Sequence, residues 1–175
     1  MNHSILQKLF GGDRRSIGRA EEVAAEVLRR LALLGALVYG LTSKDLVVRM
    51  RSADALEKVT RDRPRLLTPH KRALLKIAAN TDQQEVRWHL GSALPRMELR
   101  SHERAAAADI RFEHLRDNSS IVKTCAMQGL ADLAVRDARS RPQTADANEQ
   151  PVTSMQAWRG VDIPVKFQAM TFDRL

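Results

Sequence analysis

Hydrophobic residues recur at helical spacing along most of the first 137 residues. In the segment 20–39 this stripe consists of Val23, Val27, Leu31, Leu34 and Val38, and in the segment 83–98 of Val86, Leu90, Ala93, Leu94 and Met97. Apolar positions three and four residues apart are typical of amphipathic helices with one buried face. The pattern predicts helices over 20–39, 45–61, 69–80, 83–98, 102–116 and 119–137.

Prolines and capping residues support these boundaries. Thr68 followed by Pro69 predicts a helix start, with threonine as the N-cap and proline in the first helical position. Pro64 ends the preceding helix, because the residue before a proline avoids the α region. Asn118, Ser119 and Ser120 are each placed to cap the last helix. Pro95 lies inside a predicted helix and is expected to kink it on its outer face.

One pattern occurs three times along the chain. Residues 48–56, 86–94 and 122–130 align without gaps as Val, a cation, five residues, a small residue and Leu. The offsets of 38 and 36 residues match two helices and their turns. One helix pair cannot bury such stripes alone, whereas stacked pairs bury them against their neighbours. We therefore predict an all-α fold, a short right-handed α-α superhelix of about three to four helix pairs with an irregular C-terminal tail.

The repeated Val-Arg/Lys pattern, with acidic or capping residues just upstream, resembles the HEAT family of the armadillo-like superfamily over roughly residues 20–137. More narrowly, GGDRRSIGRAEEVA, VVRMRSADALEKVT, QQEVRWHL and SSIVKTCAMQGLADLA resemble a group of uncharacterised bacterial HEAT-repeat proteins. The resemblance implies a HEAT-like solenoid and supplies no activity. It also implies that the repeated cations brace adjacent repeats through upstream acids. These cations are Arg49, Arg87 and Lys123, and the acids are Asp45, Asp82 and Asp117.

The pattern divides the chain into two parts. Residues 1–138 form the repeat solenoid, with 1–18 as an N-terminal segment, and residues 139–175 form a linker and a C-terminal tail. Residues 139–152 are polar and bounded by prolines, which is typical of a linker. The tail either caps the last repeat or forms an arm that docks on a second copy of the chain, which would make a homodimer.

Cysteine usage and hydropathy bear on location. The single cysteine, Cys125, cannot form an internal disulfide, so we expect a reducing compartment and a cytoplasmic protein. The N-terminus lacks the order of regions that a secretory signal needs. The most apolar run, 31–41, is shorter than the roughly 20 residues of a membrane span, so we expect a buried helix and no membrane association.

Charge indicates acidic partners. The formal net charge is +8, from 29 basic and 21 acidic side chains. The segment 61–76 concentrates cations against Asp62 alone, and they are Arg61, Arg63, Arg65, Lys71, Arg72 and Lys76. They form either a solvated face or a surface that attracts a phosphate backbone or an acidic protein. We expect Arg72 and Lys76 on the concave side of the stack, with Arg104 and Arg111 extending the surface.

Two neighbouring ring residues lie beside the predicted stripes. Trp88 lies away from the main stripe of its helix, so we expect it to be partly exposed. It either packs against a neighbouring helix or serves as a binding hot spot or base-stacking platform. His89 lacks a second metal ligand in sequence and is expected to be structural.

Complete catalytic motifs are not found in the sequence. His102-Glu103 is similar to the His-Glu pairs of HEAT-type di-iron hydroxylases, but those enzymes need several such pairs. The segment 11–15 is glycine-rich without a Walker or dinucleotide-binding spacing, so we interpret it as a flexible loop. Cys125 is expected to be an inert buried thiol. We therefore expect no metal, no cofactor and no enzymatic activity.

These observations favour a macromolecular binding or scaffold module that uses a concave helical-repeat surface, with a protein as the partner. The alternative is nucleic-acid binding through the basic surface around residues 61–76. Its enzymatic version is a HEAT-like alkylpurine DNA glycosylase. The sequence has no carboxylate-plus-aromatic constellation that would carry that chemistry over.

Overall fold

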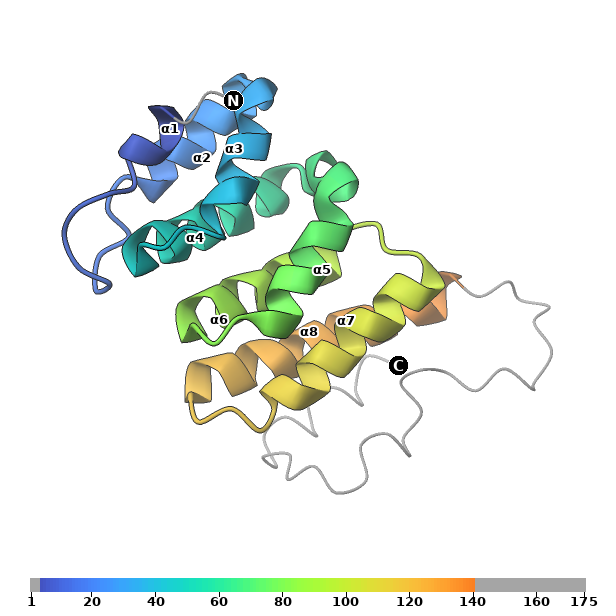
Figure 1. The fold of residues 1–175 in the computed structure, drawn as a ribbon. Coiled ribbons are helices and arrows are strands. Elements are labelled where there is room, and N and C mark those ends of the chain that lie inside the picture. The colour runs from blue at the N-terminus through green and yellow to red at the C-terminus, as the bar shows by residue number, and fades with distance from the viewer. Residues whose placement is uncertain (1–3, 141–175) are drawn as a thin grey trace.

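The computed structural model describes residues 4–140, and within that range every regular element is helical (Figure 1). The α-helices α1 to α8 are Ser4–Gln7, Ala20–Arg29, Leu34–Gly40, Leu46–Asp62, Lys71–Asn80, Gln84–Ala93, Ser101–His114 and Ser120–Ser140. The 3-10 helices η1, η2 and η3 are Leu31–Leu33, Pro64–His70 and Leu94–Arg96. The prediction of an all-α chain is confirmed for this range. The tail predicted to cap or to dock lies outside the described residues from residue 141 onward.

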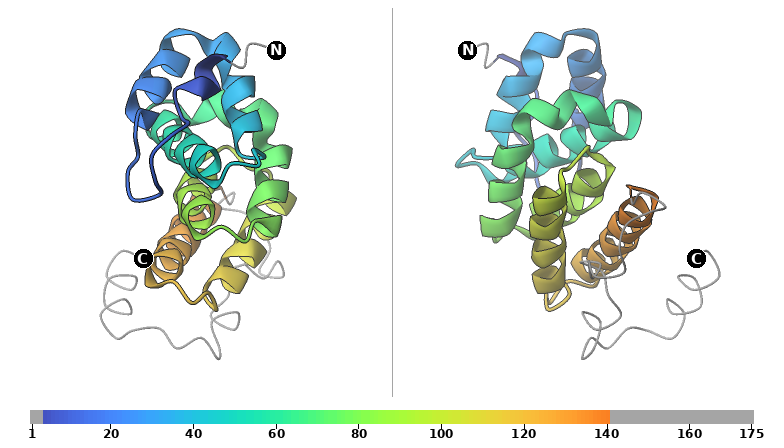
Figure 2. Two further views of the ribbon diagram at one scale, coloured as in Figure 1. Left: turned by 60° about the vertical axis from the view of Figure 1, so that its left-hand side comes forward. Right: turned by 90° about the vertical axis from the view of Figure 1, so that its right-hand side faces the viewer.

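Two sets of helices alternate along the chain. Helices α2, α4, α6 and α8 run in the same direction, and each packs against the next in extensive contact (Figure 1). Helices α3, α5 and α7 run the opposite way on one side of that row (Figures 1 and 2). Their contacts with one another are much sparser. The closely packed row therefore forms the centre of the molecule.

The core consists of the stripes that define the helices. Val86, Leu90, Leu94 and Met97 are all buried, as the periodicity of their segment predicts. Equivalent aliphatic side chains of α2, α4 and α8 join them in one continuous cluster. Burying one such side chain contributes about 1.5–3 kcal/mol, so the shared core holds the successive helix pairs together.

The predicted helix over 20–39 is wrong in one respect, because the chain reverses in its middle. Arg30 has φ −131° and ψ 78°, outside the helical region, and there α2 ends. The short η1 then turns the chain so that α3 packs against α4. Leu31, although part of the predicted stripe, lies in this turn and is 46% exposed. Neither glycine nor proline marks the reversal, so the sequence pattern does not reveal it.

The prediction that Pro64 ends the preceding helix is confirmed, because α4 ends at Asp62, but the other two prolines have different roles from those expected. Thr68 and Pro69 lie inside η2, and α5 begins at Lys71 without a side-chain cap. Pro95 lies in η3, where the α-helix ends, and it is buried rather than on an outer face. The predicted cap at Ser119 is confirmed, because the Val122 N–H donates to Ser119 Oγ at 3.4 Å.

None of the helices in the described range is both long enough and apolar enough to cross a membrane.

Candidate interaction surface

Two of the three cations of the repeated pattern, Arg49 and Arg87, connect successive helix pairs, and their acceptors differ. Arg49 Nε donates to Gln83 Oε1 at 2.9 Å, and Gln83 Nε2 donates to the Leu46 carbonyl at 2.9 Å. In the next repeat Arg87 forms an ion pair with Asp117. The acceptor thus lies in the turn that precedes the following helix of the central row. The expected pairing with the acid just upstream is wrong for both cations, because Arg49 binds Gln83 and Arg87 binds Asp117, which lie downstream. Asp82, the acid upstream of Arg87, is exposed.

The acids at the helix starts also order the backbone. Asp45 caps α4, because its Oδ1 accepts from the N–H groups of Val47 and Val48. Burial alone would raise the pKa of Asp117, but the Ser119 N–H and the Arg87 guanidinium outweigh it, and the pKa lies below its ordinary value. Asp117 therefore stays ionised and keeps its bond to the preceding repeat.

Half of the predicted basic segment is paired with acids, one in the same helix and two in other elements. Arg61 pairs with Glu57, Arg65 with Glu98 at 2.7 Å, and Lys71 with Glu103 at 2.6 Å. The remaining three are Arg63, Arg72 and Lys76, which are exposed and have no acidic partner among the described residues. The segment therefore keeps a surplus of exposed positive charge.

The basic residues of α5 lie in the row of helices that contact one another sparsely. Arg72 and Lys76 belong to the row of α3, α5 and α7. They do not lie on the closely packed side of the molecule. The helices alternate between the two rows, and α4 and α6 occupy the close-packed one.

The extension of this surface along α7 is not found. Arg104 is half-buried, and its Nη1 donates to the Leu99 carbonyl at 2.8 Å. Arg111 is only 1% exposed and lies between α6 and α8, so it cannot contact a partner. Burial lowers the pKa of Arg111 to about 10, and all three of its side-chain nitrogens lack a hydrogen-bond acceptor among the described residues.

Trp88 and His89 are both partly buried on α6, and their rings are in tilted contact at 5.6 Å between centroids. This contact joins adjacent residues of one helix, so it is not the predicted packing of Trp88 against a neighbouring helix. His89 Nδ1 lies 3.9 Å from Asp54 of α4, a carboxylate that the sequence did not indicate. Burial lowers the pKa of His89, which favours its neutral form.

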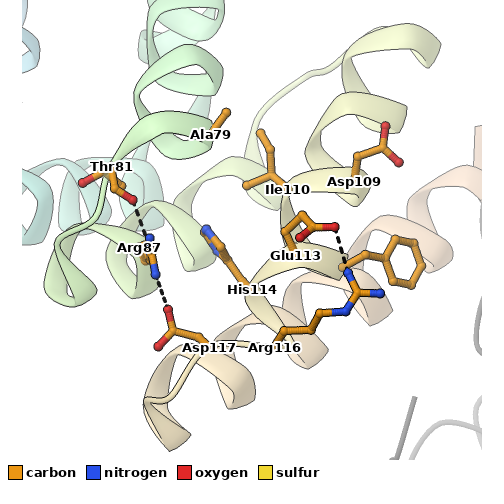
Figure 3. Close-up of a pocket in the computed structure, with 10 residues that line it drawn as sticks. Ala79, Thr81, Arg87, Asp109, Ile110, Glu113, His114, Arg116 and Asp117 are labelled. Carbon is orange, nitrogen blue, oxygen red and sulfur yellow. Dashed lines mark hydrogen bonds and ion pairs between the residues drawn. The ribbon is translucent and has the colours of Figure 1, made fainter. Parts of the chain in front are cut away.

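A surface pocket of about 650 Å³ lies between the end of α5, the start of α6 and the end of α7 (Figure 3). His114 points into it, and the Arg87–Asp117 and Arg116–Glu113 pairs lie around it (Figure 3). Burial, assisted by Arg111 and Arg87, lowers the pKa of His114 to about 4. At neutral pH the pocket therefore holds a neutral imidazole among charges that are paired with one another.

The sequence did not reveal the structural role of Arg51. This side chain is buried in α4 and donates to five backbone carbonyls of the N-terminal segment, those of Leu9, Phe10, Gly11, Asp13 and Ser16, at 2.7–3.4 Å. Gly18 has φ +54°, and a Cβ there would lie 2.6 Å from Arg51 Cζ. The glycine-rich segment is thus organised around one guanidinium, and the sequence signal for it is the glycines themselves.

Metal-binding and thiol chemistry find little support in the geometry. Within residues 4–136, no group of three or more His, Cys, Asp or Glu side chains is arranged to hold a metal ion. Glu103 is buried and bound to Lys71, while His102 is exposed. Cys125 is a free thiol and half-buried, more accessible than expected.

Comparison of the chain with protein-family models, with curated proteins and with solved structures finds no match.

Proposed function

We propose that the chain is a macromolecular binding or scaffold module, built as a short HEAT-like α-α superhelix, whose principal partner is a protein. The observation that carries this proposal is a group of exposed apolar side chains near the start of α4, which we call the apolar patch. It consists of Phe10, Ile17 and Leu46, which are 48%, 44% and 43% exposed.

The N-terminal segment and α4 hold the patch in place. Arg51 binds the carbonyls of Phe10 and Ser16, which fixes the segment against the first half of α4. Arg14 of the same segment approaches Glu85 at 3.6 Å and lines a shallow pocket together with Leu46. Exposed apolar side chains in a fixed position suit a protein interface, whose centre is apolar and aromatic. The patch therefore favours this edge of the molecule, and not a concave surface, as the place where the protein partner binds.

The connections between repeats support a scaffold role. The Arg49–Gln83 and Arg87–Asp117 contacts join consecutive helices of the central row, so the surfaces they carry are held in one arrangement. A partner then binds without ordering the module, which lowers the entropic cost of association. We also propose a cytoplasmic location, which the single free cysteine supports.

Affinity capture from the cells that naturally produce the protein tests the proposal. We expect a protein to be retained at moderate salt, and we expect a Phe10→Ser/Leu46→Ser variant to lose it. A Leu31→Ser/Val135→Ser variant is the matched control, because it removes two other exposed apolar side chains, and it should retain the partner. The captured protein is then purified, and its affinity for all three forms is measured. Equal loss in both variants, or no retention by the natural sequence, would refute the proposal.

Nucleic-acid binding is the second candidate. Arg63, Arg72 and Lys76 favour it, because they are exposed cations without an acidic partner among the described residues. Phosphate oxygens are the natural acceptors for such side chains.

A further inference from the structure

Because the helices of the central row are parallel, cations from distant parts of the chain lie at one edge of the molecule. Helices α2, α4 and α8, and α6 with η3, all end on the same side of the molecule (Figure 1). Helices α3, α5 and α7 begin there. We call this side the basic edge. Its cations are Arg29, Arg30, Arg61, Arg63, Arg65, Lys71, Arg72, Arg96, Arg100, Arg104 and Arg136, and its carboxylates are Glu26, Glu57, Asp62, Glu98, Glu103 and Asp132. Lys58 lies further from this edge, where it pairs with Asp54 of α4 and Glu21 of α2.

Among the described residues the basic edge thus carries eleven cations and six carboxylates, an excess of five positive charges. The opposite edge, where α2, α4, α6 and α8 begin, is nearly balanced. Its eight cations are Arg14, Arg15, Arg19, Lys44, Arg49, Arg87, Arg116 and Lys123, and its seven carboxylates are Asp13, Glu22, Asp45, Asp82, Glu85, Glu113 and Asp117. The excess of positive charge is therefore a property of one side of the molecule.

Helix ends do not neutralise this excess. Cations near a helix C-terminus are stabilised by its partial charge of about −0.5, which is a structural reason for placing them there. Four C-termini supply about −2 at this edge, but three N-termini supply about +1.5, so the two contributions nearly cancel. Among the described residues, the helix ends therefore leave the excess of five positive charges largely in place.

Contacts between repeats hold the basic edge in shape. Arg65 binds Glu98 and Lys71 binds Glu103, each joining η2 or α5 to the next repeat. Arg96 binds Glu57 of α4, and Arg136 Nη1 donates to the Met97 carbonyl at 3.2 Å. Glu57 is shared by Arg61 and Arg96, so one carboxylate serves two cations.

The composition of the basic edge distinguishes between classes of polyanion. Ten of its eleven cations are arginine, whose planar fork binds phosphate oxygens in pairs. Its only exposed large apolar side chains in the described range are Leu31 of η1 and Val135 of α8, so it lacks the apolar centre of a protein interface. Within the described residues, the exposed Phe and Tyr side chains are Phe10 and Tyr39, which belong to segments away from this edge, so neither offers a base-stacking platform there.

Its length also suits a duplex. Packed helices lie about 8–10 Å apart, so the four helix ends span roughly 25–30 Å. One turn of duplex DNA is about 34 Å long, and both strands present phosphates along it. We propose that the basic edge, from α2 to α8, binds the phosphate backbone of duplex nucleic acid without reading its bases. This inference rests on the second candidate function and extends it well beyond residues 61–76.

Fluorescence anisotropy of the full chain with a labelled duplex of about 20 base pairs, from about 50 to 200 mM salt, tests the inference. We expect affinity to fall about 100-fold or more over that range, because several phosphates release their counterions. Arg63→Glu/Arg72→Glu should weaken binding at least about 10-fold, since both cations are exposed and unpaired. Arg29→Glu, at the far end of the edge, should weaken it about threefold or more. Arg15→Glu/Lys44→Glu is the matched control of equal charge on the opposite edge and should change affinity less than about threefold.

Each contrary result has a distinct meaning. If the natural sequence fails to bind duplex at about 50 mM salt, both the nucleic-acid function and this inference are overturned. If duplex binds but the control variant loses as much affinity as the edge variant, the function stands and the basic edge is the wrong surface. If the affinity of the Arg29→Glu variant is unchanged, the site is confined to η2 and α5, and its proposed extent is overturned. Equal or tighter binding of a single strand, or of poly-glutamate, would overturn the choice of partner.

Discussion

Two buried arginines show that the surroundings of a guanidinium decide whether it stabilises or destabilises the fold. Arg51 satisfies its guanidinium with five backbone carbonyls, whereas the nitrogens of Arg111 have no acceptor among the described residues. Gly91 leaves room for Arg111, since a Cβ at position 91 would lie 2.6 Å from Arg111 Nη1. A buried charge without a partner costs stability, and a buried charge with partners becomes costly to remove.

Substitution by methionine should therefore have opposite effects at the two positions. We expect Arg111→Met to raise the free energy of unfolding by about 1–3 kcal/mol, because an unpaired charge leaves an apolar interface. Arg51→Met should lower it by at least about 2 kcal/mol, because the carbonyls of the N-terminal segment lose a charged donor. Urea denaturation followed by circular dichroism measures both. A loss of stability in Arg111→Met would mean that the guanidinium has an acceptor in solution.

His114 makes stability depend on pH. Its pKa of about 4 in the folded chain lies below the ordinary value of 6.5, because of burial and the neighbouring Arg111 and Arg87. The unfolded chain therefore binds a proton that the folded chain rejects, so this contribution is complete above the unfolded pKa and is lost as pH falls. Between about pH 7 and 5.5 the loss is about 1 kcal/mol.

Urea denaturation at those two pH values checks this. We expect His114→Gln to lose about 1 kcal/mol less than the natural sequence on acidification. His89, whose pKa is also lowered by burial, contributes equally to both proteins and cancels in the comparison. The same pH dependence in both proteins would contradict the assignment to His114.

At the scale of elements, the N-terminal segment is organised by its glycines. Gly11 and Gly18 both have positive φ, but a Cβ at Gly11 meets nothing within 4 Å, whereas a Cβ at Gly18 meets Arg51. Gly11→Ala should therefore lower the free energy of unfolding by about 1–2 kcal/mol, the strain of an alanine in the left-handed conformation. Gly18→Ala should cost more and should also release the segment from α4.

Hydrogen exchange and denaturation measure these two effects. In Gly18→Ala the amides of residues 9–18 should exchange faster at a given pH, and in Gly11→Ala they should change little. Because Phe10 and Ile17 of the apolar patch belong to this segment, Gly18→Ala should also lower the affinity for the proposed protein partner. An equal loss of unfolding free energy in the two variants would show that the Arg51 side chain moves away from position 18 without strain.

At the scale of the whole molecule, the parallel direction of the central helices gives the two edges different charges. The cations near the C-termini of these helices gather on one side of the molecule. The side where the helices begin is nearly balanced in charge and carries the apolar patch. The two proposals therefore concern opposite sides of one rigid stack. The Arg49–Gln83 and Arg87–Asp117 contacts join the repeats along the balanced side, and the Arg96–Glu57 contact does so along the basic edge.

Local signals in the sequence were sufficient for most helices of the described range. Val86, Leu90, Leu94 and Met97 are buried as their spacing predicts, because a helical stripe has only one way to face a core. Ser119 caps α8 for an equally local reason. The reversal at Arg30 was not predictable, because it depends on α3 packing against α4 and not on a turn residue.

The basic cluster around residues 61–76 was visible in the sequence, because those charges are adjacent in the chain. The Arg61–Glu57 pair is local, because the two residues are four apart in α4, whereas only the tertiary structure brings Glu98 to Arg65 and Glu103 to Lys71. It also removed Arg111 from the surface, and it joined Arg29, Arg96 and Arg136 to one edge. The sequence by itself therefore determined the helices and the total charge, which depend on local spacing and composition. Folding decided where that charge is exposed, because pairing and burial depend on residues that are distant in the chain.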